Sequence, residues 1–134
     1  MAHEQWTAVD RYITDLLVAN DPALEGVLKA SAAAGLPEIH VTPNQGKFLQ
    51  LLATIRGARS ILEIGTLGGY STIWLARGMP AGGRLVTLEF DPRYAEVARA
   101  NLAKASLSAV VEVRSVARWT RCRSLPQRGP LRST

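Results

Sequence analysis

Glu63 and Glu89 are acidic residues that stand at the ends of two short apolar segments, and glycines follow the first of them at positions 65, 68 and 69. The first segment reads I-L-E-I-G-T-L-G-G-Y-S from position 61, and the second reads R-L-V-T-L-E and ends at position 89. Glycines directly after a buried strand permit a tight turn and a close approach of the backbone to a ligand. Because parallel strands end at one edge of a sheet, Glu89 is placed to accept hydrogen bonds from two ribose hydroxyls. The pattern predicts a nucleotide-type binding site.

These residues need strands and helices that bring them to one sheet edge. The sequence predicts strands at about 60–64, 84–89 and 110–114, with helices between them at about 71–77 and 92–105. Earlier helices are predicted at about 5–19, 22–34 and 43–56, and the last two begin with a capping residue and a proline. Strands that alternate with helices indicate an α/β fold with a parallel sheet and right-handed crossovers. We expect about three strands, with helices on both faces.

The composition indicates a globular protein of one domain or part of one, with 134 residues of which 47% are hydrophobic. No apolar run is long enough for a membrane span, and the first residues lack the basic start and apolar core of a signal peptide. The single cysteine, Cys122, excludes an internal disulfide and has no metal-binding context. These features predict a cytoplasmic protein without a membrane partner.

The net charge of +5 is confined to the end of the chain. Residues 1–114 contain 11 basic and 11 acidic residues, whereas residues 115–134 contain five arginines and no acid. A short basic tail can bind phosphates, but a solvated tail is the simpler interpretation. We therefore expect no nucleic-acid partner.

Three motifs occur together: the segment at 61–71, V-T-P-N-Q-G-K-F-L from position 41 and L-E-F-D-P from position 88. This combination resembles the class I S-adenosylmethionine-dependent methyltransferases. The resemblance is closest to the cation-dependent O-methyltransferases of the catechol and caffeoyl-CoA type, and it covers about residues 5–114. It implies an incomplete Rossmann-like fold, S-adenosylmethionine as cofactor, and methyl transfer to a phenolic or similar hydroxyl of a small molecule. It also implies a homodimer.

The resemblance implies a set of cofactor-binding residues around the glycine turn: Val41, Glu63, Gly65, Leu67, Gly69, Tyr70, Ser71 and Glu89. Glu63 and Ser71 suit the ammonium of the methionyl end, and the glycines admit the methionyl chain. Glu89 suits the ribose diol. These residues also have alternative roles. Glu63 could bind the helix N-terminus of its own turn, and Glu89 could accept from the ribose in an NAD-binding fold. Val41 and Tyr70 could be packing residues of the protein interior.

The family's metal ligands have no counterpart in this chain. In those enzymes an aspartate ends the fourth strand, an aspartate–asparagine pair follows, and the divalent cation, Mg²⁺, binds the substrate oxygens. The chain has no acidic residue after Glu112, and His3 and His40 are lone histidines without a second ligand at metal spacing. We therefore expect no metal site here, no identifiable catalytic residue and an impaired activity.

The sequence predicts three regions: N-terminal helices at 1–40, a cofactor-binding core at 41–114 and an irregular basic tail at 115–134. We hypothesise that the chain is truncated or frameshifted after about Arg114. If residues 115–124 are encoded by GC-rich codons of our choosing, restoring one lost base ahead of them gives the reading frame V-G-R-A-L-D-A-L-P-V. Sequencing the gene around codon 115 tests this. A nicotinamide-dependent oxidoreductase fragment is an alternative, although the turn lacks G-x-G-x-x-G. A non-catalytic cofactor-binding remnant is another.

Overall fold

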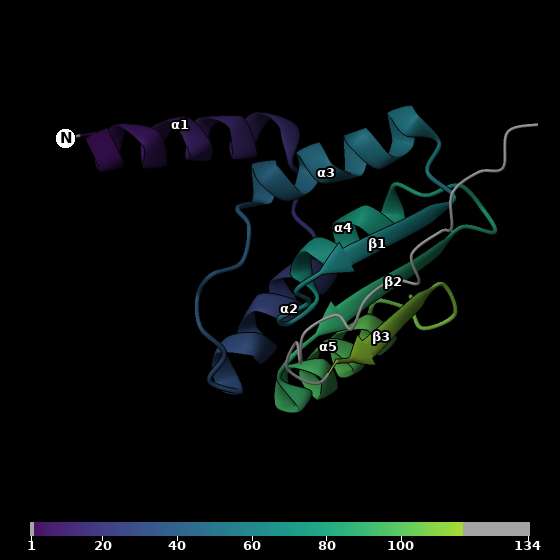
Figure 1. Ribbon diagram of the computed structural model, residues 1–134. Helices are drawn as coiled ribbons and strands as arrows, with labels where there is room; N and C mark the ends of the chain where they lie inside the picture. The colour runs from purple at the N-terminus through teal and green to yellow at the C-terminus, as the bar shows by residue number, and fades with distance from the viewer. Residues whose placement is uncertain (1, 117–134) are drawn as a thin grey trace, which may run out of the picture.

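The structure is a computed structural model that describes residues 2–116. Helices α1 (Ala2–Leu17), α2 (Pro22–Ala33) and α3 (Pro43–Arg56) precede the first strand (Figure 1). Strands and helices then alternate as β1 (Ser60–Ile64), α4 (Tyr70–Arg77), β2 (Arg84–Glu89), α5 (Pro92–Lys104) and β3 (Val111–Ser115). The predicted α/β fold is confirmed.

Local signals in the sequence set the helix starts. Asp21 caps α2 and accepts hydrogen bonds from two backbone amides of its first turn, and Asp91 caps α5 in a similar way. Thr42 and Gln45 form a reciprocal capping box at the start of α3. All three helices begin with proline, whose fixed φ suits the first helical turn.

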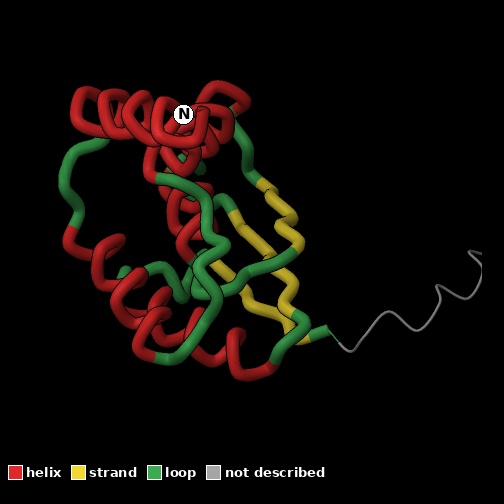
Figure 2. Tube along the Cα trace, turned by 90° about the vertical axis from the view of Figure 1, so that its left-hand side faces the viewer, coloured by secondary structure: helices red, strands yellow, loops and turns green. Residues whose placement is uncertain are grey.

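The sheet is parallel, with strand order β1-β2-β3 and direct pairing of Leu62 with Val86 and of Val86 with Glu112. Our expectation of helices on both faces is wrong for the described residues. Both crossovers run in the same direction across the sheet, and right-handed crossovers of that kind place α4 and α5 on one face. Figure 2 shows the strands along one side of the molecule, with the helices gathered away from them.

The core lies between the sheet and the helices that cover it. Ile73 of α4, Leu85 of β2 and Leu102 of α5 have at most 1% of their surface exposed. Leu24 and Val27 of α2 join the same cluster. Burial of each such side chain contributes about 1.5–3 kcal/mol, so this cluster fixes the sheet edge where the turn lies.

The opposite face of the sheet is open within residues 2–116. Leu62 and Ile64 of β1 are 65% and 72% exposed, because alternate residues of a strand point to opposite faces. On α3, the apolar side chains of Phe48, Leu51 and Ile55 are also exposed. The third strand lies one residue later than predicted, so Ser115 belongs to β3 rather than to the tail.

Candidate cofactor site

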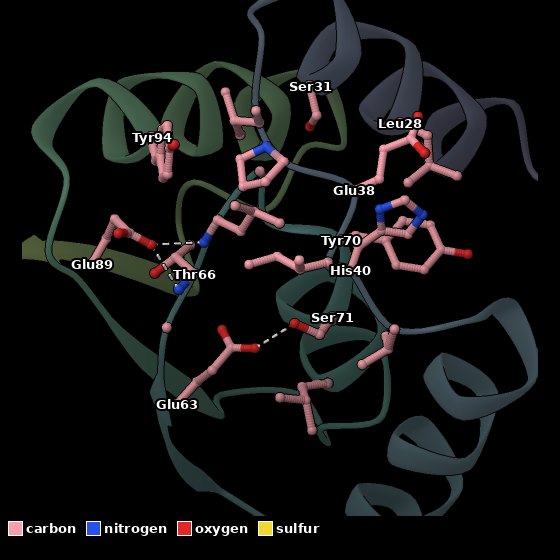
Figure 3. A pocket seen from close by; sticks show the side chains of 18 of the residues that line it. Leu28, Ser31, Glu38, His40, Glu63, Thr66, Tyr70, Ser71, Glu89 and Tyr94 are labelled. Carbon is pink, nitrogen blue, oxygen red and sulfur yellow. Dashed lines mark hydrogen bonds between the residues drawn. The ribbon is translucent and has the colours of Figure 1, made fainter.

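A cavity of about 1040 Å³ lies at the carboxyl end of β1. It is bounded by the glycine turn, by the start of α4, by α2 and by the segment 36–41, with Glu89 and Tyr94 at one side (Figure 3). Of the eight residues predicted to bind the cofactor, all but Gly69 line this cavity. The structure therefore brings together residues from β1, β2, α4 and the loop before α3.

The Glu63 carboxylate is held by hydroxyl groups from the first turn of α4. Ser71 Oγ donates to Glu63 Oε1 at 2.7 Å, and Thr72 Oγ1 donates to Glu63 Oε2 at 2.6 Å. A carboxylate has about four acceptor positions, so these two bonds orient the group and leave capacity for a ligand. Glu63 therefore contacts the start of α4 through the side-chain hydroxyls of Ser71 and Thr72.

The Glu89 carboxylate joins two loops. Its Oε2 accepts hydrogen bonds from the amides of Thr66 and Leu67 at 3.0 and 2.7 Å. Its Oε1 accepts from the amides of Phe90 and Asp91 at 2.8 and 2.9 Å. Glu89 is only 6% exposed, so these charge-assisted bonds compensate for its burial. The proposed ribose contact must share or displace some of these donors.

The turn after β1 uses backbone conformations that favour glycine. Gly65 and Gly69 have φ values of 91° and 86°, in the left-handed region. Leu67 has φ 50° without being glycine, and its amide is one of those bound by Glu89. Gly69 is the N-cap residue of α4 and does not line the cavity, so its role here is to turn the chain into the helix.

Buried polar residues that sequence reasoning missed support the turn. Thr66 Oγ1 and Thr87 Oγ1 lie 2.6 Å apart in a hydrogen bond, and Asn101 Nδ2 donates to the Gly68 carbonyl at 2.9 Å. Both threonines and Asn101 are at most 2% exposed. Polar residues at inward positions of a predicted strand and helix were the signal, since such groups need partners when buried.

An aromatic group closes one end of the cavity. The Tyr70 ring lies edge to face with the His40 ring, with centroids 5.7 Å apart, and with the Trp74 ring at 6.5 Å. Burial raises the pKa of the Tyr70 phenol above its ordinary value of 10.0. Val41 is half-buried beside them and lines the cavity. His40, a lone histidine in the sequence, is exposed and also lines the cavity.

Metal-ligand clusters and membrane-spanning helices are both absent from the described residues. No group of three or more His, Cys, Asp or Glu side chains in residues 2–116 could hold a metal ion. Over the same range, no helix has both the length and the apolar character needed to cross a membrane.

Comparison with known proteins connects this site to one enzyme family. The sequence profile of the O-methyltransferase family matches residues 15–126. The catechol O-methyltransferase of Niastella koreensis is 52% identical over 115 residues, covering 86% of this chain and 52% of that protein. The Bacillus cereus O-methyltransferase, solved in complex with SAH, has a TM-score of 0.82 and 61% identity, covering 84% of this chain and 51% of that one.

A Streptomyces achromogenes O-methyltransferase solved in complex with SAM also matches, with a TM-score of 0.78 and 50% identity over 84% of this chain and 51% of that one. This chain therefore spans about half the length of the relatives that it matches. The family match extends beyond Arg114, where the resemblance was expected to stop, into residues outside the described part of the chain.

The relatives named above are O-methyltransferases. The alternative of a nicotinamide-dependent oxidoreductase fragment is therefore not supported. With its profile match over residues 15–126, this chain belongs to the O-methyltransferase family, which includes relatives solved with S-adenosylmethionine or S-adenosylhomocysteine.

Proposed function

We propose that the cavity at the end of β1 binds S-adenosylmethionine, for methyl transfer to a phenolic or related hydroxyl of a small molecule. The observation that carries the proposal is the Glu63 carboxylate, held by Ser71 and Thr72 at the cavity wall beside the glycine turn. This is a fixed negative charge where the backbone can approach a ligand closely.

The residues present fit the chemistry of this cofactor. Its methionyl end carries an ammonium that suits Glu63, and its ribose diol suits the carboxylate of Glu89. A cofactor without phosphates needs no phosphate-binding loop, and the glycine turn does not have that pattern. When bound, the cofactor supplies an electrophilic methyl group on a sulfonium. The protein's part is to bind and orient it and to limit the access of water.

The resemblance implied a divalent cation, but the described residues do not provide a site for one. Residues 2–116 provide no cluster of three candidate ligands. No step of the proposal therefore depends on a metal held by this part of the chain. We assign no acceptor substrate and no catalytic residue among residues 2–116, and we propose that the activity of this chain is impaired.

We further propose a cytoplasmic protein that acts on a small molecule, binds no nucleic acid and self-associates as a homodimer. The balanced charge of residues 1–114 supports the absence of a nucleic-acid partner, and the exposed apolar residues of α3 and β1 support self-association. We also propose the division into N-terminal helices at 1–40, a cofactor-binding core at 41–114 and a basic tail at 115–134, except that Ser115 joins the core as the last residue of β3. The rest of the tail, apart from Val116, lies outside the described residues.

A non-catalytic cofactor-binding remnant is a second candidate, favoured by the chain's coverage of only about half of its relatives. Calorimetric titration of the full chain with S-adenosylmethionine, and separately with NAD, tests the binding proposal. Saturable binding of S-adenosylmethionine without binding of NAD supports it, and the reverse contradicts it. A methylation assay with catechol and added Mg²⁺ then separates an enzyme from a remnant.

A further inference from the structure

The cavity is lined by more acidic than basic side chains. Its lining carboxylates are Glu38, Glu63 and Glu89, and its lining cations or potential cations are Lys29 and His40. The methionyl end of the proposed cofactor carries an α-carboxylate as well as an ammonium. None of the eight residues predicted to bind the cofactor has a cationic side chain. The sequence reasoning therefore supplied no cationic partner for this carboxylate.

Lys29 is the weaker of the two candidates. It lies on α2 with its side chain 80% exposed, and its Nζ is 3.8 Å from Glu25 Oε2, one helical turn earlier. An exposed lysine–glutamate ion pair of this kind is weak, and the lysine ammonium is strongly hydrated. Its ammonium has a surface partner outside the cavity, which leaves His40.

The His40 ring is positioned but has no polar partner among residues 2–116. Its face-to-edge contact with Tyr70 fixes the ring at the cavity end, at an interplanar angle of 61°. It directly precedes Val41, and Figure 3 shows its ring against that of Tyr70, at the end of the cavity away from Glu89. Neither imidazole nitrogen makes a hydrogen bond or an ion pair within the described part of the chain.

We propose that His40, in its protonated form, binds the α-carboxylate of the cofactor's methionyl end. The inference rests on the proposed function and assigns a further binding residue to the same site. An imidazolium donates charge-assisted hydrogen bonds from both ring nitrogens, and a carboxylate accepts them. Glu63 would then bind the ammonium and His40 the carboxylate, so the two charges of the amino-acid end meet opposite charges from two different elements.

This pairing makes cofactor affinity depend on pH in a defined direction. Histidine side chains change charge between about pH 5 and 8, so the pair is strongest at the lower end of that range. The other titratable groups that line the cavity are Lys29, Glu38, Glu63, Tyr70, Glu89 and Tyr94. Tyrosine, lysine and glutamate side chains ordinarily keep one charge state across that range.

Calorimetry on the full chain tests the proposal with two neutral-sulfur ligands, S-adenosylhomocysteine and 5′-methylthioadenosine, which lacks the amino-acid end. Titrations at about pH 5.8 and about pH 7.2 bracket the range in which histidine changes charge. For the unmodified chain, we expect S-adenosylhomocysteine to bind roughly threefold to tenfold more tightly at the lower pH. Binding of 5′-methylthioadenosine should not change.

Two substitutions and one control assign the effect. His40→Gln should remove the pH dependence and leave 5′-methylthioadenosine binding unchanged, while His40→Lys should bind S-adenosylhomocysteine tightly at both pH values. Lys29→Gln, the matched control, should behave as the unmodified chain does. Thermal melting verifies that each variant folds.

Persistence of the pH dependence in His40→Gln, or its loss in Lys29→Gln, overturns the assignment to His40. An equal pH dependence for both ligands also overturns it, because the amino-acid end would then not be involved. If neither ligand binds at either pH, the proposed function itself fails, and the His40 proposal fails with it.

Discussion

Glu89 shows how one side chain can serve both the fold and a ligand. Its carboxylate accepts four backbone hydrogen bonds, from the turn after β1 and from the start of α5. A ligand role at its position was predictable, because an acid at the end of a second parallel strand is typical of ribose binding. Its backbone partners were not predictable, because they depend on loop conformations that sequence patterns do not specify.

We predict that Glu89→Ala weakens S-adenosylmethionine binding by about 1.5–3 kcal/mol, the range for hydrogen bonds to a charged group. Because four amides lose their acceptor, the same change should also lower the free energy of unfolding. Calorimetry gives the first quantity and urea unfolding the second. Glu96→Ala, an exposed position on α5, is the matched control. Unchanged affinity in a folded Glu89→Ala protein would reject the ribose role.

His40 marks the limit of residue-level prediction in a different way. As a lone histidine, it carries no spacing signal for a metal or a catalytic pair. Its place in the cavity follows from the path of the chain between α2 and α3, which brings its ring against Tyr70. Only its position next to Val41 could have indicated a role at the site.

At the scale of elements, local rules placed α3, β1 and β2 at the predicted boundaries. Proline after a capping residue and glycine after a strand act over a few residues, so a sequence shows them directly. The open face of the sheet was not predicted, because it depends on the spatial order of the strands within the sheet. In the described residues, the order β1-β2-β3 puts both crossover helices on the same side.

The contact between α2 and α4 predicts how stability changes in acid. Burial opposes ionisation of Asp21, but its hydrogen bonds with Arg77 and with the amides of Leu24 and Ala23 outweigh this and lower its pKa below 3.8. A carboxyl whose folded pKa is depressed adds stability at higher pH and loses it as pH falls through the folded value. The free energy of unfolding should therefore decline as the pH drops below 3.8.

Asp21→Asn should reduce this acid-dependent loss and lower stability near neutral pH by about 1 kcal/mol or less, since asparagine still caps a helix. Urea unfolding at a series of pH values measures both effects. Asp15→Asn, an exposed position on α1, serves as the control. The interpretation fails if Asp21→Asn and the control show the same dependence of stability on pH.

At the scale of the whole molecule, one face of the sheet and one edge of β1 are uncovered in residues 2–116. Leu62 and Ile64 project from that face, and β1 pairs only with β2. An uncovered strand edge with exposed apolar residues favours association with other chains. We therefore predict that the chain self-associates at micromolar concentrations.

Leu62→Lys should reduce this association, because a charge on an exposed strand face opposes edge and face pairing. Sedimentation velocity over a concentration series measures the change in average mass. Ala103→Lys places the same charge at an exposed position of α5, on the covered side of the sheet, and should leave the association unchanged. Equal behaviour of the two variants would show that the open face is not the contact.

Cofactor binding through Glu63 is the central claim, and calorimetric titration of Glu63→Gln with S-adenosylmethionine tests it most directly. Glutamine keeps the size of the side chain and an oxygen that can accept from Ser71 or Thr72, but it removes the negative charge that faces the ligand. We predict an affinity loss of about 1.5–3 kcal/mol, with little change for Glu96→Gln. Glu63→Gln protein that remains folded and binds S-adenosylmethionine as tightly as the unmodified chain would contradict the claim.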